Sequence, residues 1–503
     1  MTLVSALANM GPRVEDHRPW PRVVVDQRIW RDAIAGIAAG EATLTGLWGE
    51  REAVHLGLID VATAEVIILS LPCSERRFPS VGLTHAPALR LERAIRDLYG
   101  LEPEGCPDSR RWLDHGRWGV RHPHGDCEAA AANGNRYDFL ASEGPPMHQI
   151  PVGPVHAGII EPGHFRFTAN GETVVRLEER LGYVHKGILH CMAGAPLERA
   201  AKLAGRVSGD STVAYALAFA RAIEAALGIV PAPRSVWLRA LMAELERIAN
   251  HFGDIGAICN DASFSLLHAH CGILREHVLR TADTCFGHRL MMDRIVPGGV
   301  ARDIPENGIE MVRTLIRTIR RRFPILIALY DNTASLQDRT VNTGALGADL
   351  AQRYGAGGYV GRASGRAFDA RKVPGYPPYD NLKFDVPVRA TGDVDARVWV
   401  RIDEVRQSVR LIEQILDGLP GHAEAGQDAQ RRGGEGVAMV EGFRGDILVW
   451  VRINSDRIIE HCYLRDPSWF QWPLLEAAIE GNIVADFPLC NKSFNCSYSG
   501  HDL

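Results

Sequence analysis

The sequence predicts an α+β fold, with a small α/β N-terminal domain followed by a larger, mainly α-helical domain that carries peripheral β-hairpins. Three observations indicate this arrangement. Strand-like and helical runs alternate through residues 1–120, turn-forming residues are concentrated at 121–146, and long apolar stretches with helical periodicity dominate 147–503. We therefore expect two domains, 1–120 and 147–503, joined by a linker at 121–146.

The first domain is expected to contain helices at residues 25–40 and 87–99, with strands at 53–59 and 65–71 between them. The second domain is expected to begin with two strands, at 153–166 and 172–177. The dipeptide Asn170-Gly171, typical of hairpin turns, lies between these two strands. Helices are then predicted at 184–204, 211–228, 233–259, 264–291, 306–331, 345–355 and 396–417. A loop is predicted at 422–436, strands at 436–440 and 446–453, and a last helix at 473–480.

Composition excludes several classes of function. The net charge of -5 and the pI of about 6.4 give no basic excess, which argues against nucleic acid as a partner. The ten cysteines form no C-x-x-C pair, which argues against zinc, a self-contained iron–sulfur cluster and a thioredoxin-like motif, and favours free thiols in a reducing cytoplasm. Neither a signal peptide nor a run of eighteen apolar residues is evident, so membrane association is expected through partners.

An ordered series of short motifs marks the first domain. The series is Phe78-Pro79-Ser80-Val81, Glu92-Arg93, Asp97-Leu98-Tyr99-Gly100, Pro107-Asp108 and Arg110-Arg111. Ordinary ion pairs on a solvated helix explain each residue separately, but not the order. The series resembles the thirty-kilodalton subunit of respiratory complex I, which implies a docking domain without a cofactor.

A longer series marks the second domain. It includes Gly153-Pro154-Val155-His156, Glu161-Pro162-Gly163-His164-Phe165-Arg166, Tyr183-Val184-His185-Lys186-Gly187, Pro297-Gly298-Gly299-Val300, Gly361-Arg362-Ala363-Ser364-Gly365 and Phe384-Asp385-Val386-Pro387-Val388. This series is similar to the forty-nine-kilodalton subunit of complex I and to the large subunit of membrane-bound nickel–iron hydrogenases of the formate hydrogenlyase and hydrogenase-4 type.

The hydrogenase resemblance points to four positions that carry metal-binding thiolates in that family, in the patterns R-x-C-G-x-C and D-P-C-x-x-C. In this sequence they read Ser208, Ser211, Ser497 and Gly500. Nickel in such a site is held by soft thiolates, which a serine hydroxyl cannot replace near neutral pH. We therefore expect no metal bound by this chain.

The complex I resemblance implies a candidate quinone and proton site. His156 matches the histidine that meets the quinone head group, and Asp261 matches its carboxylate partner; a surface turn histidine and a helix cap are the alternatives. A histidine held by a carboxylate is a competent proton donor to a quinone. The tyrosine of that site is replaced by Gly209. The residues expected to line the same cavity are Arg206, Ser208, Gly209, Asp210 and Ser211.

Glu244, Arg247 and His251 fall on one face of a predicted helix. A buried Glu–Arg pair is the first interpretation and a proton path the second.

Three classes of function follow from the resemblance. The preferred one is a peripheral core subunit of a membrane-bound oxidoreductase that couples electron transfer, with a quinone as a candidate acceptor, to ion translocation without a nickel–iron centre. The alternatives are a non-catalytic scaffold of such a complex and an active nickel–iron hydrogenase. Any use of NAD(H) is expected to rest on another subunit.

The resemblance also implies partners and a location. The partners are a small iron–sulfur subunit, similar to the twenty-kilodalton subunit of complex I and carrying a 4Fe–4S cluster, a ferredoxin-like iron–sulfur subunit, and antiporter-like and quinone-channel-like membrane subunits. The expected location is the cytoplasmic face of the inner (plasma) membrane.

Overall fold

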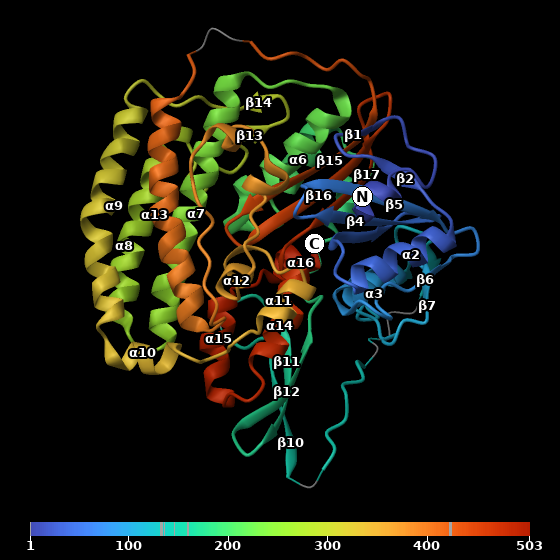
Figure 1. The fold of residues 1–503 in the computed structure, drawn as a ribbon, viewed down its shortest axis with the longest axis horizontal. Helices are drawn as coiled ribbons and strands as arrows, with labels where there is room; N and C mark the ends of the chain where they lie inside the picture. Colours follow the sequence, from blue (N-terminus) through green and yellow to red (C-terminus); the bar gives the residue numbers. More distant parts are fainter. Residues whose placement is uncertain (1, 131–133, 135, 145, 158–159, 422–424) are drawn as a thin grey trace.

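The α+β fold is confirmed. The computed structural model describes residues 2–130, 134, 136–144, 146–157, 160–421 and 425–503. Figure 1 shows a helical bundle at one side of the molecule, a blue N-terminal sheet with its helices at the other, and a second sheet between them. A three-stranded β-hairpin unit projects at the bottom of the view.

The N-terminal sheet has the order β2-β5-β4-β3, with strands Arg22–Val24, Glu65–Pro72, Ala53–Asp60 and Thr43–Gly49. Helix α2 (Gln27–Ala38) begins where the side chain of Asp26 accepts a hydrogen bond from the Ile29 amide. Helix α3 (Leu89–Tyr99) ends at Gly100, whose φ of 68° is the left-handed conformation that glycine adopts at low cost. Both predicted helices and both predicted strands of this region are present; β3 was not predicted.

The bundle consists of long helices with wide apolar faces. Its main members are α7 (Pro233–Asp261), α8 (Ser265–Phe286), α9 (Gly308–Asp331) and α13 (Val394–Asp417). Helix α6 (Thr212–Leu227) lies against β15 and β16. The shorter helices α10, α11 and α12 are Ala334–Thr340, Ala348–Arg353 and Gly358–Ala363. The helix predicted at 184–204 is wrong at its centre: it divides into α4 (Ile188–Met192) and α5 (Leu197–Ala204), since Gly194 has a φ of 78° and Pro196 has no amide hydrogen to donate.

The second sheet joins the two ends of the sequence. Strands β15 (Gly434–Gly442), β16 (Gly445–Ile453) and β17 (Ile459–Arg465) form an antiparallel meander, and β1 (His17–Arg18) pairs with β15 in parallel. This sheet packs on the N-terminal sheet, where the rings of Trp48 and Tyr463 stack with centroids 4.8 Å apart. The buried ion pair between Arg22 and Glu435, 2.6 Å long, joins the same two sheets. The two regions that the motifs distinguish therefore share one interior.

The hairpin unit contains β10 (Met147–Val152), β11 (His164–Asn170) and β12 (Thr173–Arg180). The predicted strand at 153–166 is wrong before His164. Gly153 has a φ of 85°, and Pro154 and Pro162 lack the amide hydrogen that a strand ladder uses, so the described part of 153–163 is a loop.

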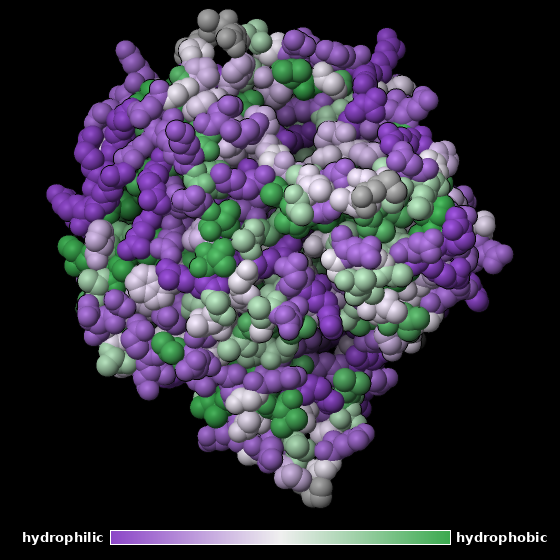
Figure 2. Space-filling view, in the orientation of Figure 1, coloured by the Kyte–Doolittle hydropathy of each residue, from purple (hydrophilic) through white to green (hydrophobic). Residues whose placement is uncertain are grey.

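The C-terminal segment adds three helices, α14 (Ser468–Ala478), α15 (Phe487–Phe494) and α16 (Tyr498–Asp502). Figure 2 shows hydrophilic side chains over much of the viewed face, including the outer edge of the bundle beside α9. Within the described ranges, no helix is both long enough and apolar enough to span a membrane.

Candidate functional site

The structure brings together the two segments that carry the replaced thiolate positions. Ser208 precedes the short helix η2 (Gly209–Ser211) at the start of α6, and Ser497 caps α16 by accepting a hydrogen bond from the Gly500 amide at 2.8 Å. The hydroxyl oxygens of Ser208 and Ser497 lie 2.9 Å apart, and both side chains are buried. Residues almost three hundred positions apart therefore meet in one cluster.

Asp210 and Arg444 form the charged part of this cluster. Asp210 accepts hydrogen bonds from the hydroxyls of Ser208 at 2.8 Å and Ser211 at 3.3 Å. Arg444, from the β15–β16 turn, donates to both carboxylate oxygens of Asp210, at 2.8 and 2.6 Å, and to the Ser211 hydroxyl at 3.2 Å. Burial alone would raise the pKa of Asp210, but the Arg444 guanidinium outweighs it and holds this pKa below its ordinary value. The carboxylate is therefore ionised and paired.

Gly500, the fourth replaced position, faces a buried carboxylate. A Cβ atom added at Gly500 would stand 2.5 Å from Oδ2 of Asp466. The same oxygen accepts a hydrogen bond from the hydroxyl of Tyr215 on α6, at 2.6 Å. Burial, and then the neighbouring Asp466, raise the pKa of Tyr215 well above its usual range. Asp466 therefore occupies the space that a larger side chain at position 500 needs.

The chemistry of these donors can be compared with what a nickel–iron centre requires. Such a centre takes four thiolates, whereas this cluster offers hydroxyls, a glycine and a cationic guanidinium. The two cysteines of the C-terminal segment do not compensate, since burial raises the pKa of Cys490 to about 11 and that of Cys496 well above its ordinary value. Among the described residues, no group of three or more His, Cys, Asp or Glu side chains is placed to hold a metal ion. The residues present do not fit a nickel–iron centre.

Two predicted members of the site differ in their placement. Arg206 is exposed and donates to Asp293, with one contact of 2.7 Å, so it does not line the cluster as expected. Gly209 does lie at the cluster, and no atom lies within 4 Å of a Cβ placed there. The position that holds a tyrosine in complex I therefore borders open space.

His156 and Asp261 do not form the expected pair. His156 lies on the β10–β11 loop, where its Nε2 is 3.4 Å from the hydroxyl of Tyr498 in α16. Asp261 is the last residue of α7, and its charged neighbours are Lys492 and His268. No hydrogen bond or ion pair in the described part of the chain joins His156 to Asp261. The predicted pairing is wrong for this structure, because the carboxylate lies at the end of α7 and the imidazole packs on α16.

Comparison with known proteins gives a family match for each of the two regions of the chain. The family described as "Respiratory-chain NADH dehydrogenase, 49 Kd subunit" matches residues 265–432, and the one described as the 30 Kd subunit matches residues 31–126. The carbon monoxide-induced hydrogenase of Rhodospirillum rubrum is 32% identical over 353 residues, which cover 69% of this chain and 97% of that protein. The chain belongs to the family that unites this complex I subunit with the hydrogenase large subunits.

Other family members share both regions of the chain. Formate hydrogenlyase subunit 5 of Escherichia coli (strain K12) is 29% identical over 461 residues, covering 86% of this chain and 78% of that protein. The C/D subunit of the NADH-quinone oxidoreductase of Phocaeicola vulgatus is 28% identical over 445 residues, covering 82% and 86%. The chain is thus a fusion of the two kinds of complex I region, as its motifs predicted.

A buried ionic network lies beside the cluster in this family member. Glu244 and Arg247 approach to 3.4 Å, and Arg371 donates to Glu244 at 2.9 Å. His251 lies 2.7 Å from Glu404, which also pairs with Arg362 at 2.7 Å. The expected Glu–Arg pair is present as part of this network. Burial lowers the pKa of His251, which favours the neutral imidazole.

Sequence reasoning missed three residues of the cluster: Arg444, Asp466 and Tyr215. Arg444 follows strand β15 and Asp466 follows strand β17. No motif or spacing around either residue predicted that it belongs to the site. The buried Tyr215 is one apolar position among many on α6. Spacing could not reveal them, because they reach the cluster through the pairing of the second sheet.

Proposed function

We propose that this chain is the peripheral core subunit of a membrane-bound oxidoreductase related to complex I and formate hydrogenlyase, and that it acts without a nickel–iron centre. Electron transfer to a quinone would be coupled there to ion translocation by membrane partners. The supporting observation is the hydrogen-bonded cluster of Ser208, Ser497, Asp210 and Arg444, in which hydroxyls and an ion pair replace thiolates.

The electrostatics of the cluster support this proposal. A thiolate site stabilises a metal cation, whereas here the carboxylate of Asp210 is already neutralised by Arg444. A cation placed between them would compete with a guanidinium that holds both carboxylate oxygens. Hydrogen chemistry at this cluster is therefore disfavoured.

The β10–β11 loop supports a role in quinone chemistry. An imidazole can donate and accept protons near neutral pH, and His156 presents one beside Tyr498 on a loop where Val155 is 84% exposed. An apolar, exposed loop that carries a histidine can meet a hydrophobic quinone. In this proposal His156 donates a proton to the quinone without help from Asp261.

The proposed partners follow from the family. They are the small iron–sulfur subunit with its 4Fe–4S cluster, the ferredoxin-like subunit, and the antiporter-like and quinone-channel-like membrane subunits. The chain would lie with them at the cytoplasmic face of the plasma membrane. A non-catalytic scaffold is the second candidate, and the observation that favours it is the missing contact between His156 and Asp261 in the described part of the chain.

The complex purified with this chain tests the proposal. Nickel content, hydrogen evolution, and the oxidation of reduced ferredoxin or NADH by an added quinone should be measured on one preparation. We expect substoichiometric nickel and quinone-dependent turnover. His156→Gln should lower that turnover by about 10²-fold, the typical contribution of a general acid, while His148→Gln on the same hairpin should not.

Each outcome discriminates between the candidates. Stoichiometric nickel with hydrogen evolution would overturn the proposal in favour of a hydrogenase. A complex that is inert to every donor would overturn it in favour of the scaffold. Turnover that is equal in the two histidine variants would remove His156 from the quinone site.

A further inference from the structure

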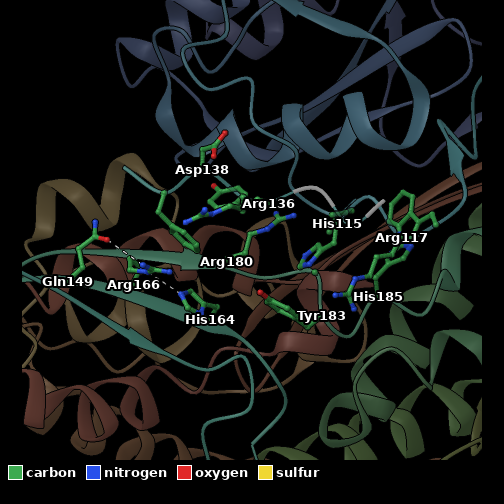
Figure 3. Close-up of a pocket in the computed structure, with 16 residues that line it drawn as sticks. His115, Arg117, Arg136, Asp138, Gln149, His164, Arg166, Arg180, Tyr183 and His185 are labelled. Carbon is green, nitrogen blue, oxygen red and sulfur yellow. Dashed lines mark hydrogen bonds between the residues drawn. The ribbon is translucent and has the colours of Figure 1, made fainter. Parts of the chain in front are cut away.

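A large cavity lies between the hairpin unit and the segment that connects the two regions of the chain. Its volume is about 740 Å³. Figure 3 shows side chains from the hairpin and from the connecting segment around a common space. The charged residues that line it include Arg117, Arg136, Arg166, Arg180 and Asp138. Four arginines thus face one aspartate among the described lining residues.

Arg180 is the strongest indication of a ligand. It is 3% exposed, and its side chain donates to the carbonyl oxygen of Trp112. It forms no ion pair with any carboxylate in the described part of the chain, and burial lowers its pKa to about 10. A guanidinium buried without a counter-ion is costly, and an anion in the cavity would relieve that cost.

Arg166 lies on the same hairpin. Its hydrogen-bond partners are neutral, namely the Gln149 side-chain oxygen and the His164 ring, each at 3.3 Å. Its guanidinium also lies 4.5 Å from the centroid of the Phe139 ring. Arg166 therefore has no counter-ion among the described residues either. Its guanidinium is positioned by the Gln149 amide, the His164 imidazole and the Phe139 ring.

Two histidines of the cavity, His115 and His164, have lowered pKa values. Burial, and then the nearby Arg180, lower the pKa of His115 to about 4. Burial also lowers the pKa of His164. A neutral imidazole can donate one hydrogen bond without adding charge, so recognition of an anion would rest on the arginines.

We propose that this cavity binds a small molecule that carries phosphate groups, with Arg166 and Arg180 as its principal ligands. Guanidinium forks match phosphate oxygens in charge and geometry. The cavity volume lies within the range of about 300 to 1,000 Å³ that is usual for small-molecule sites. The rings of Trp118 and Tyr183, which pack on His185 and His115, also line the cavity and can contact an apolar part of the ligand. The proposed phosphate binding does not depend on the proposed redox function.

Binding of inorganic pyrophosphate to the full chain, measured by titration calorimetry, tests the proposal. We expect saturable binding that weakens with added salt, because it depends on charge. Arg166→Gln should weaken it at least about tenfold, since a charged hydrogen bond contributes about 1.5 to 3 kcal/mol. Arg180→Gln should have the same effect. Arg321→Gln, at an exposed position on α9, is the matched control and should leave binding unchanged.

Two further measurements separate the sources of phosphate. Vesicles of phosphatidylglycerol should compete only weakly if the ligand is a free phosphate compound. Binding to vesicles but not to pyrophosphate would overturn the proposal in favour of a lipid contact. Loss of pyrophosphate binding in the assembled complex would overturn it in favour of an acidic segment of a partner subunit. Equal binding by the control and both cavity variants, or no binding by the native chain, would also overturn it.

Discussion

Replacement of Gly500 by alanine tests whether Asp466 blocks the fourth replaced position. The added Cβ would lie 2.5 Å from Oδ2 of Asp466 and 2.8 Å from the Ser497 hydroxyl. Asp466 cannot easily withdraw, because it is bonded to the Tyr215 hydroxyl at 2.6 Å and to the Ser468 amide at 2.8 Å. Overpacking costs about 1 to 3 kcal/mol, and losing a hydrogen bond to a charged group costs about 1.5 to 3 kcal/mol.

Alanine also recovers about 1 kcal/mol of helix propensity in α16. We therefore expect Gly500→Ala to lower the free energy of unfolding by about 2 kcal/mol, measured by urea titration of the full chain with circular dichroism. Gly209→Ala is the matched control, since no atom lies within 4 Å of its Cβ position, and it should change stability by less than about 0.5 kcal/mol.

A double-mutant cycle tests whether the Asp466 carboxylate is the group that clashes with a side chain at position 500. In an Asp466→Ala background, Gly500→Ala should cost at least about 1 kcal/mol less than in the native protein, because the carboxylate is gone. Equal stability of Gly500→Ala and Gly209→Ala would refute the steric argument. So would an unchanged cost of Gly500→Ala in the Asp466→Ala background.

Three further predictions concern ionisable groups and can be measured by the same urea titration. Arg444→Met should destabilise the protein by about 1.5 to 3 kcal/mol, the value of hydrogen bonds to a charged group, because the partly exposed Asp210 carboxylate stays partly solvated. In an Asp210→Asn background the same substitution should cost at least about 1 kcal/mol less, and additive effects would contradict the pairing. Burial lowers the pKa of His17 from 6.5 to about 4, so the unfolded chain binds the proton first and stability falls as pH drops below 6.5. His17→Asn should therefore reduce the loss of stability between pH 7 and 5 by about 2 kcal/mol. An unchanged loss would show that protonation of His17 does not cause it. Glu435 keeps a second partner, Arg452 at 2.9 Å, so Arg22→Met should cost about 1.5 to 3 kcal/mol, the value of a hydrogen bond to a charged group; unchanged stability would contradict an ion pair that joins the two sheets.

Much of the fold could be predicted from local patterns. Apolar periodicity was sufficient for α7, α8, α9 and α13, because each buries a continuous stripe over many turns. It failed for α16, which is five residues long, and its periodicity cannot be distinguished from a loop. Strand β17 was missed, although the turn formers Asn454, Ser455 and Asp456 separate it from β16.

The part of the candidate site that could be predicted is the pair of segments that the motif series places at the four replaced thiolate positions. Ser208 and Ser497 were placed together by the order of motifs, and the structure brings their hydroxyls within 2.9 Å. The contact of His156 with Tyr498 on α16, which replaces the expected pairing with Asp261, was not predictable in the same way. It depends on how a loop folds against α16, and the sequence holds no local signal for that contact.

The contact between the N-terminal sheet and β15 has a consequence for the synthesis of the protein. Arg22 and its partner Glu435 are separated by 413 positions. At a synthesis rate of about 5 to 20 residues per second, the ribosome needs roughly 20 to 80 s to deliver the second after the first. Throughout that interval the nascent sheet presents an arginine and apolar rings to the solvent, so we expect newly made chains to depend on chaperones until translation is nearly complete.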